Sequence, residues 1–254
     1  MRENKLKRKL AAGETAVGPF LISSEPKLVE ICGLAGFDFI IADMEHGPIT
    51  VESAENLCRA ADAVGITPII RVRKNDGPQI QRALDIGSGG VQVPQIESKA
   101  DAEIAVRGAK YKPLGQRGLS FYTRAGDYMV HGNTGYTDKL NAEQMLVVHV
   151  EGIRGIEKLD EIISVPHIDV IFLGPYDLSQ SLGIPGQVRD PKVIGLMKDA
   201  TKKIRSGGKA VGTFADTPEI AREWMALGVQ YISLNVDVGL FARITRDWVK
   251  SVRG

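Results

Sequence analysis

Cysteine is scarce in this sequence: only Cys32 and Cys58 occur in 254 residues, each within a segment of periodic apolar residues. Two such cysteines argue against the disulfide framework of a small secreted domain, and we interpret both as small buried hydrophobic residues. Long apolar runs are also missing, because none approaches the roughly 18 residues that a membrane-spanning helix needs. We therefore do not expect the chain to cross a membrane.

An excess of either charge is absent as well. The formal net charge is only +1, so the charge balance indicates neither nucleic acid nor an anionic membrane surface as a partner. The first residues, MRENKLKRKLAAGE, are charged and do not resemble a signal peptide. These features predict a cytoplasmic protein.

What the sequence does contain is an alternation of two patterns. Short apolar, β-branched runs occur eight times: VGPFLI, FDFIIAD, TPIIRV, GGVQVP, MLVVHVE, IDVIFLG, KAVGTF and VQYISLN. Most alternate with stretches of helical spacing, which include 26–35, 51–64, 79–86, 100–109 and 218–227. Parallel strands need crossover helices and are buried on both faces, so the alternation predicts a parallel sheet. Eight such units predict an α/β fold, a single (β/α)8 TIM barrel domain covering residues 1–254.

The connections between these units carry a second signal. The segments AGFDFI, AVGITP, IGSGGV, SGGKAV and ALGVQY place glycine between a helix and the next strand, where a left-handed residue ends the helix. The connection from Lys110 to Met145 is far longer than is usual between a helix and a strand. We expect part of it to be helical and the rest to be a lid or an oligomer contact.

Ionisable residues follow the predicted strands at one end of the barrel, where the reacting site of such barrels forms. The segments are Asp43-Met-Glu-His46 after the second strand, Arg71 after the third, Glu151 after the fifth and Gly174-Pro-Tyr-Asp177 after the sixth. Arg71 and Glu151 directly end apolar strands, where an unpaired charge is costly, so both are expected to have partners.

Glu151 and Asp177 are candidate ligands for a hard cation such as Mg²⁺ or Mn²⁺, with water completing the coordination shell. Alternatively, the two carboxylates neutralise Arg71 and bind backbone amides. Histidine and cysteine do not cluster, which argues against a closed structural zinc site.

Two histidines are candidates for the site. His46 is a possible proton shuttle because imidazole titrates near neutral pH, and Asp43 could fix its tautomer; alternatively, His46 is a solvated loop residue. His149 precedes Glu151 by two residues in the same strand, so both side chains should project to one face. There His149 either lines the site or packs in the core.

Candidate contacts for an anionic substrate come from two segments. Arg71 offers a planar fork of donors for a keto acid and a charge for a developing oxyanion, unless it only forms an ion pair. The backbone amides of Gly174, Tyr176 and Asp177 are a candidate anion cradle, in which Pro175 cannot donate.

At these residues the chain resembles the HpcH/HpaI family of metal-dependent (class II) pyruvate aldolases, and the resemblance extends over nearly the whole sequence. It rests on D-x-E-H at 43–46, the arginine that ends the third strand, VEGIRGIEKLDEI from residue 150 and G-P-x-D-L-S from residue 174, in this order. Such a combination is specific.

The resemblance implies that a 4-hydroxy-2-oxo acid is reversibly cleaved to pyruvate and an aldehyde through a metal-stabilised pyruvate enolate. It implies a divalent ion (Mg²⁺, Mn²⁺ or Co²⁺) bound by Glu151 and Asp177, and contact of Arg71 with the pyruvyl oxygen. Amides around residues 174–177 would hold the pyruvate carboxylate, and His46 with Asp43 would act as an acid–base dyad.

The resemblance also implies a homo-hexamer, a trimer of dimers that exchange their C-terminal helices, with Asp85 at a subunit contact near the site. The chain departs from many relatives at His149, where they have Gln, at Tyr176, where they have Ala, and at Asn235, where they have Gly. These departures leave the acceptor aldehyde open.

Three other functions are compatible with the pattern. A citryl- or malyl-thioester lyase needs room for coenzyme A, and no basic motif for its phosphates is found. A phosphosugar isomerase needs Gly-rich phosphate loops after strands seven and eight, whereas GTFADTP and SLNVDVG stand there. A non-catalytic keto-acid-binding barrel would bind pyruvate without exchanging its protons.

Overall fold

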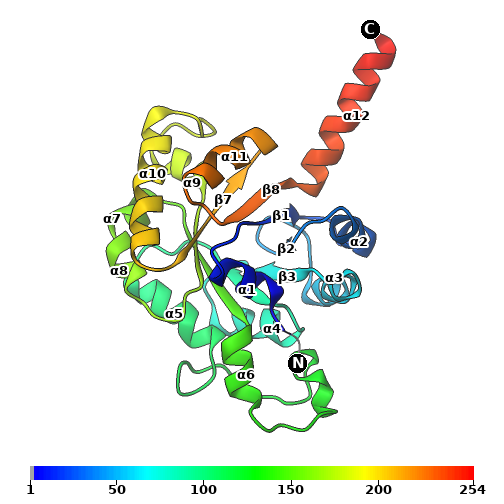
Figure 1. The fold of residues 1–254 in the computed structure, drawn as a ribbon, viewed down its shortest axis with the longest axis vertical. Helices are drawn as coiled ribbons and strands as arrows, with labels where there is room; N and C mark the ends of the chain where they lie inside the picture. The colour runs from blue at the N-terminus through cyan, green and yellow to red at the C-terminus, as the bar shows by residue number, and fades with distance from the viewer. Residues whose placement is uncertain (1–2) are drawn as a thin grey trace.

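The computed structural model describes residues 3–254, and its centre is a closed barrel of eight parallel strands in chain order, in which β8 pairs with β1 (Figure 1). The strands are β1 (Ala16–Leu21), β2 (Phe39–Asp43), β3 (Thr67–Arg71), β4 (Gly90–Val93), β5 (Met145–Val150), β6 (Val170–Leu173), β7 (Ala210–Ala215) and β8 (Tyr231–Val236). Each of the eight predicted runs overlaps one of them, so the predicted (β/α)8 barrel is confirmed.

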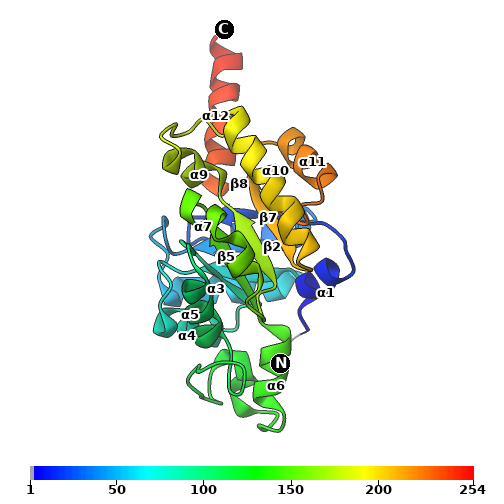
Figure 2. The ribbon, with the colours of Figure 1, turned by 90° about the vertical axis from the view of Figure 1, so that its left-hand side faces the viewer.

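Helices surround the barrel and carry the chain from one strand to the next (Figures 1 and 2). They are α1 (Lys5–Ala11), α2 (Pro26–Leu34), α3 (Val51–Val64), α4 (Gly77–Asp85), α5 (Lys99–Ala109), α6 (Tyr136–Glu143), α7 (Ile153–Glu157), α8 (Leu159–Ile163), α9 (Pro175–Ser181), α10 (Pro191–Ser206), α11 (Pro218–Ala226) and α12 (Asp237–Arg253), with a 3₁₀ helix η1 (Arg124–Met129). The five stretches of helical spacing correspond to α2, α3, α4, α5 and α11.

Apolar side chains fill both sides of the barrel wall. Every residue of β2 to β6 is buried, which explains why these strands are nearly continuous apolar runs. In the inner core the rings of Phe39 and Tyr231 stack with their centroids 4.3 Å apart. Leu6 and Leu10 of α1 join this inner cluster, so α1 closes the amino-terminal end of the barrel.

The inward-facing side chains change from apolar to polar toward the carboxyl ends of the strands. Ile41 and Ile69 belong to the inner core, and two residues further along the same strands come Asp43 and Arg71. Asp43 lies in register with Arg71, and Arg71 with Gln92 of β4. The twofold period of a strand therefore delivers these charged groups to the mouth of the barrel.

Glycine follows the end of the helix in five of the helix-to-strand connections, as predicted. The φ angles of Gly36, Gly65, Gly87, Gly208 and Gly228 all lie between 74° and 93°. Gly65 shows the reason most directly, because it caps α3 in the left-handed conformation that a side chain disfavours.

The long connection between α5 and β5 contains η1 and α6, so the prediction that part of it is helical is confirmed. It lies at the amino-terminal end of the barrel, far from α12 (Figures 1 and 2). Its Arg124 donates to the carbonyl oxygens of Ile86 and Gly87, just before β4, at 3.2 and 3.4 Å. The interpretation of this connection as a lid over the chain's own site is therefore wrong, because the candidate site residues lie at the carboxyl ends of the strands, at the opposite end of the barrel.

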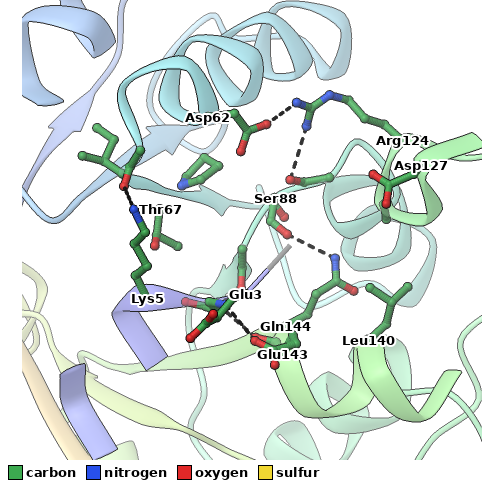
Figure 3. Close-up of a pocket in the computed structure, with 17 residues that line it drawn as sticks. Glu3, Lys5, Asp62, Thr67, Ser88, Arg124, Asp127, Leu140, Glu143 and Gln144 are labelled. Carbon is green, nitrogen blue, oxygen red and sulfur yellow. Dashed lines mark hydrogen bonds and ion pairs between the residues drawn. The ribbon is translucent and has the colours of Figure 1, made fainter. Parts of the chain in front are cut away.

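A cavity of about 350 Å³ lies between this connection and the starts of β3 and β4 (Figure 3). Its polar side chains are engaged in holding the connection in place: Arg124 pairs with Asp62, and Gln144 Nε2 donates to the Ser88 carbonyl oxygen at 3.1 Å. Lys5 Nζ donates to the Gly65 carbonyl oxygen at 3.3 Å. None of the predicted site residues lines this cavity.

The C-terminal helix α12 extends away from the barrel in both views (Figures 1 and 2). None of its residues is buried. Its start is fixed to the end of β1, because Asp237 accepts hydrogen bonds from the backbone amides of Ile22 (3.1 Å) and Ser23 (3.0 Å). Within residues 3–254 no helix combines the length and the apolar character that crossing a membrane requires.

Candidate active site

The carboxyl ends of the strands surround a cavity of about 530 Å³. Residues from β2, β3, β5 and the start of α9 line it together: Asp43, Arg71, His149, Glu151, Tyr176 and Asp177. His46, Gly174 and Pro175 line it too. The structure thus brings together all the predicted site residues except Asp85.

The charge of Arg71 is balanced by two carboxylates. Its Nε donates to Asp43 Oδ1 at 2.8 Å and its Nη2 to Asp43 Oδ2 at 2.5 Å, while Nη1 lies 3.2 Å from Glu45 Oε2. The guanidinium also lies over the ring of Phe20, 4.6 Å from its centroid. Burial opposes ionisation of Asp43, but the hydrogen bonds and charge of Arg71 outweigh it and lower the pKa of this carboxyl. Arg71 therefore has the partner that its position predicted.

A buried chain of hydrogen bonds leads from β8 to Glu151. The Tyr231 hydroxyl donates to Gln92 Oε1 at 3.0 Å, Gln92 Nε2 bonds His149 Nε2, and His149 Nδ1 bonds Glu151 Oε2 at 3.0 Å. Because the amide group of Gln92 donates to Nε2, the proton of a neutral His149 belongs on Nδ1, where it donates to Glu151. The prediction that His149 and Glu151 share a face is confirmed, and His149 also stacks on Phe172 with centroids 4.4 Å apart.

Glu151 and Asp177 differ in how the protein holds them. Glu151 Oε2 accepts a hydrogen bond from His149 Nδ1, and its Oε1 accepts one from the backbone amide of Gln95 at 2.8 Å. Burial alone would raise the pKa of Glu151, but His149, the Gln95 amide and Arg71 together lower it. Asp177 behaves in the opposite way, because burial and the nearby charge of Glu151 raise the pKa of its carboxyl. These two neighbouring oxygen donors repel each other, which a cation between them would relieve.

Gly174 is required by its contact with Glu151. A Cβ at this position would lie 2.7 Å from Glu151 Cβ and 3.1 Å from Oε2. The Gly174 amide is already used, since it donates to the Val150 carbonyl oxygen at 3.4 Å. The predicted anion cradle is thus reduced to the amides of Tyr176 and Asp177, the first of α9, for which no acceptor is found among residues 3–254.

Comparison with known proteins identifies the group to which this barrel is related. The model of the HpcH/HpaI aldolase/citrate lyase family matches residues 16–243. The chain belongs to this family. Its sequence is 33% identical over 252 residues to the hydroxypyruvate/pyruvate aldolase of Pseudomonas aeruginosa, covering 99% of this chain and 93% of that one.

Two further proteins are similar to this chain over most of their length. The 2-keto-3-deoxy-L-rhamnonate aldolase of Escherichia coli K12 is 32% identical over 240 residues, which is 94% of this chain and 89% of that enzyme. The crystal structure of an HpcH/HpaI aldolase/citrate lyase family protein from Burkholderia cenocepacia J2315 has a TM-score of 0.93 and 32% identity, covering 99% of this chain and 100% of that one. The names of these relatives include aldolases for different substrates.

In the structure, the Asp43 carboxylate contacts groups other than the imidazole of His46, with which it was expected to pair. Asp43 accepts from the backbone amide of His46 at 3.3 Å and is otherwise committed to Arg71 and the Glu45 amide. The His46 side chain is 68% exposed, and its Nε2 lies 3.9 Å from Glu45 Oε2. The Asp43 carboxylate therefore orients Arg71, and the acidic group beside the imidazole is Glu45.

Glu45 of the D-x-E-H segment is a residue of the site for which the sequence predicted no role. Its side chain is 11% exposed and its Oε1 accepts from Gln95 Nε2 at 3.5 Å. Burial raises the pKa of Glu45 to about 7, with Arg71 opposing this and Glu151, Asp43 and Asp177 adding to it. Glu45 is two residues after Asp43, and residues two apart in an extended chain share a face. This spacing could have predicted that the Glu45 side chain faces the site together with Asp43.

The structure also shows a wall of the cavity that the sequence did not predict. The Tyr176 hydroxyl donates to Asp216 Oδ1 at 2.7 Å, and the Tyr176 ring packs edge-on against Phe214 with centroids 5.8 Å apart. Asn235 Nδ2 donates to the Asp216 carbonyl oxygen at 2.8 Å. Asn235 has a φ of 63°, a conformation in which asparagine is among the better tolerated residues and glycine the most permissive.

Asp85 does not reach this cavity within one chain. It lies at the last turn of α4, at the amino-terminal end of the barrel, where Oδ1 accepts from Arg117 Nη2 at 2.5 Å. Gln81 Nε2 donates to its Oδ2 at 3.4 Å. Asp85 of one chain could therefore contribute only to the site of a neighbouring chain.

Proposed function

We propose that this chain is a divalent-metal-dependent aldolase that reversibly cleaves a 4-hydroxy-2-oxo acid to pyruvate and an aldehyde. The observation that carries the proposal is the placement of two neighbouring carboxylates, Glu151 and Asp177, in one cavity with Arg71. Pyruvate aldolases among the relatives support it, since one is named hydroxypyruvate/pyruvate aldolase.

The donor set of the cavity fits a Mg²⁺, Mn²⁺ or Co²⁺ ion. Glu151 and Asp177 offer hard oxygen ligands, and burial with mutual repulsion raises the pKa of Asp177. Within residues 3–254 no three His, Cys, Asp or Glu side chains come together as a metal cage. Two carboxylates suit an ion that keeps several water or substrate oxygens as ligands. When bound, such an ion supplies Lewis-acid polarisation of the keto group.

The protein's own groups then account for recognition of pyruvate. Arg71 is held in place by Asp43, and its N–H groups not bound to carboxylates are available to the pyruvyl oxygen, where negative charge develops. The free backbone amides of Tyr176 and Asp177 are suited to donate hydrogen bonds to the pyruvate carboxylate, because the first N–H groups of a helix have no acceptor within it. His46, at the exposed edge of the cavity, takes the proton of the C4 hydroxyl through water in the cleavage direction.

The test is exchange of the pyruvate methyl protons in D₂O, read by mass spectrometry, because it needs no aldehyde. Exchange should require added Mg²⁺, Mn²⁺ or Co²⁺ and stop with chelator. E151Q and D177N should abolish it, whereas E157Q, at an exposed glutamate of α7, should not change it. Undiminished exchange after complete metal removal would exclude the proposed function.

The alternatives give different results in the same assay. A keto-acid-binding barrel without activity would bind pyruvate and exchange no protons with any metal. A thioester lyase would need cations for the phosphates of coenzyme A, but among the described residues Arg71 is the only lysine or arginine that lines this cavity, beside the two histidines His46 and His149. The few cationic groups of the cavity thus favour an aldehyde over a coenzyme A thioester as the second product.

We also propose the hexameric assembly, a trimer of dimers with exchanged C-terminal helices, and one domain for residues 1–254. The exposure of α12 supports the exchange, because an amphipathic helix with no buried residue lacks its apolar partner within the chain. Asp85, which cannot reach its own cavity, is proposed at a subunit contact.

A further inference from the structure

The wall formed by Tyr176, Phe214, Asp216 and Asn235, here called the acceptor wall, closes the side of the cavity contributed by α9 and by the ends of β7 and β8. Arg71 and Glu151 come from β3 and β5, on the other side of the barrel mouth. If pyruvate lies between Arg71 and the first-turn amides of α9, the second reactant must lie against the side chains of the acceptor wall. The chemistry of this wall then determines which aldehyde is accepted.

The acceptor wall is rich in hydrogen-bond acceptors. Tyr176 directs its hydroxyl proton to Asp216, and burial together with this bond raises the pKa of Tyr176 to about 12, so the hydroxyl stays protonated. The lone pairs of Tyr176 Oη and Asp216 Oδ2 remain for a ligand. Asn235 uses its amide nitrogen on the Asp216 carbonyl oxygen and its Oδ1 on the Val236 amide, at 2.8 and 2.7 Å. A group that donates a hydrogen bond fits here, whereas one that only accepts does not.

The balance of charge points the same way. Four carboxylates line the cavity: Asp43, Glu151, Asp177 and Asp216. Arg71 compensates Asp43, and the proposed metal compensates Glu151 and Asp177. For the Asp216 carboxylate, the residues described here provide a hydroxyl but no cation. A second carboxylate placed against the acceptor wall would meet this negative charge in a partly buried site.

We infer that the acceptor aldehyde is uncharged and carries a hydroxyl group close to its carbonyl carbon, which donates to the Tyr176–Asp216 pair. This inference rests on the proposed aldolase function and names its substrate class. Aldehydes that bear a carboxylate, such as glyoxylate or succinic semialdehyde, are disfavoured. Tyr176 and Asp216 are the residues that determine this specificity.

The experiment compares three two-carbon aldehydes, glycolaldehyde, acetaldehyde and glyoxylate, in metal-supported addition to pyruvate, with glyceraldehyde, propanal and succinic semialdehyde as longer counterparts. The wild-type kcat/KM should be at least about tenfold higher for the hydroxyaldehydes than for either comparison group, which corresponds to about 1.4 kcal/mol. Each ratio is then compared between variants, so that differences in aldehyde hydration cancel.

D216N keeps the shape of the side chain and removes its charge, so the preference for glycolaldehyde over glyoxylate should fall at least fivefold. Y176F keeps the ring and the Asp216 charge, so it should reduce the preference for glycolaldehyde over acetaldehyde while glyoxylate stays disfavoured. D199N, at an exposed aspartate of α10, is the matched control and should change neither ratio. Circular dichroism of each purified variant shows that it folds, and because each comparison is a ratio of two aldehydes within one variant, a change in the shared pyruvate step cancels.

The inference is overturned if the wild type prefers a carboxylate-bearing aldehyde, or if a folded D216N protein leaves both ratios unchanged. Loss of methyl exchange in the wild type with every metal would instead overturn the proposed function. The two failures are therefore distinguishable.

Discussion

The Asp43 carboxylate accepts two hydrogen bonds from the guanidinium of Arg71, of 2.8 and 2.5 Å, at the mouth of the barrel. Both side chains are almost fully buried, with 2% and 11% of their surface exposed. Such a pair contributes orientation more than net stability, but leaving one member unpaired is costly. The position of Arg71 thus depends on Asp43.

D43N is therefore expected to reduce the free energy of unfolding by about 3 kcal/mol, because Arg71 loses its buried counter-charge. Pyruvate methyl exchange should fall by about 100-fold as the guanidinium loses its fixed position. Urea unfolding followed by circular dichroism gives the first value and mass spectrometry the second. H46A, at an exposed side chain, is the control, and its stability should stay within about 0.5 kcal/mol of the wild type. A D43N protein as stable as H46A would contradict this role of Asp43.

The barrel could be predicted from sequence because its determinants are local. Apolar β-branched runs such as FDFIIAD are buried on both faces, and glycine at the ends of helices has a conformation that few other residues adopt. The rule that barrel sites form after strands then placed Asp43, Arg71, Glu151 and Asp177 in one cavity.

The partners within the site could not be predicted in the same way. Asp43 is three residues from His46 in sequence, yet the register of β2 with β3 places it beside Arg71. Likewise, Asp216 meets Tyr176 across 40 residues, and no periodic pattern marks such a contact. The end of the barrel at which the long connection between α5 and β5 lies follows from the order of the elements, because a connection from a helix to the next parallel strand meets the strand at its start.

Gly174 provides a test of how Glu151 is positioned. A methyl group at residue 174 would lie 2.7 Å from Glu151 Cβ, so G174A should displace this carboxylate and weaken Mn²⁺ binding at least tenfold. Isothermal titration calorimetry measures the affinity without relying on activity. G195A is the matched control, because Gly195 is in α10 with nothing within 4 Å of an added Cβ. It should leave Mn²⁺ affinity unchanged and stabilise the protein by about 0.5–1 kcal/mol. Equal Mn²⁺ affinities for the two variants would refute the prediction.

The hydrogen-bonded chain behind Glu151 predicts a second effect on metal affinity. Q92L removes both the acceptor for Tyr231 and the partner of His149, so His149 and Glu151 lose their fixed orientation. Mn²⁺ affinity should fall by about 10–100-fold, the usual cost of losing a group that orients a metal ligand. Y231F removes only the far end of the chain and should have a smaller effect. If Y231F weakened binding as much as Q92L, orientation through the chain would not explain the loss.

Lys110 gives a prediction about pH and stability. It is buried, and its Nζ donates to the carbonyl oxygens of Asn141 (2.9 Å) and Gln144 (2.7 Å). Burial lowers the pKa of Lys110 from 10.5 to about 8. Between these two pH values the unfolded chain binds a proton that the folded chain has released, so stability increases with pH in this window.

The measurement is the free energy of unfolding of the wild type minus that of K110M, determined from pH 7 to 10.5. This difference should be constant below about pH 7 and then shift in favour of the wild type by up to about 3 kcal/mol. Taking the difference removes the contributions of other titrating groups. A difference that does not change with pH, or that moves in favour of K110M, would show that burial does not lower the pKa of Lys110 in the folded protein.

The exposed face of α12 predicts how copies of the chain associate. Phe241, Trp248 and Val252 repeat at helical spacing on one side of the helix and are 71%, 67% and 86% exposed. An apolar stripe of this kind on a helix without a partner favours burial against another subunit. The wild type should therefore have the mass of six 27.5 kDa chains by light scattering, whereas W248E should dissociate into smaller species. K250A changes the opposite, polar face and should keep the assembly. A W248E protein with the same mass as K250A would mean that this stripe does not hold the copies together.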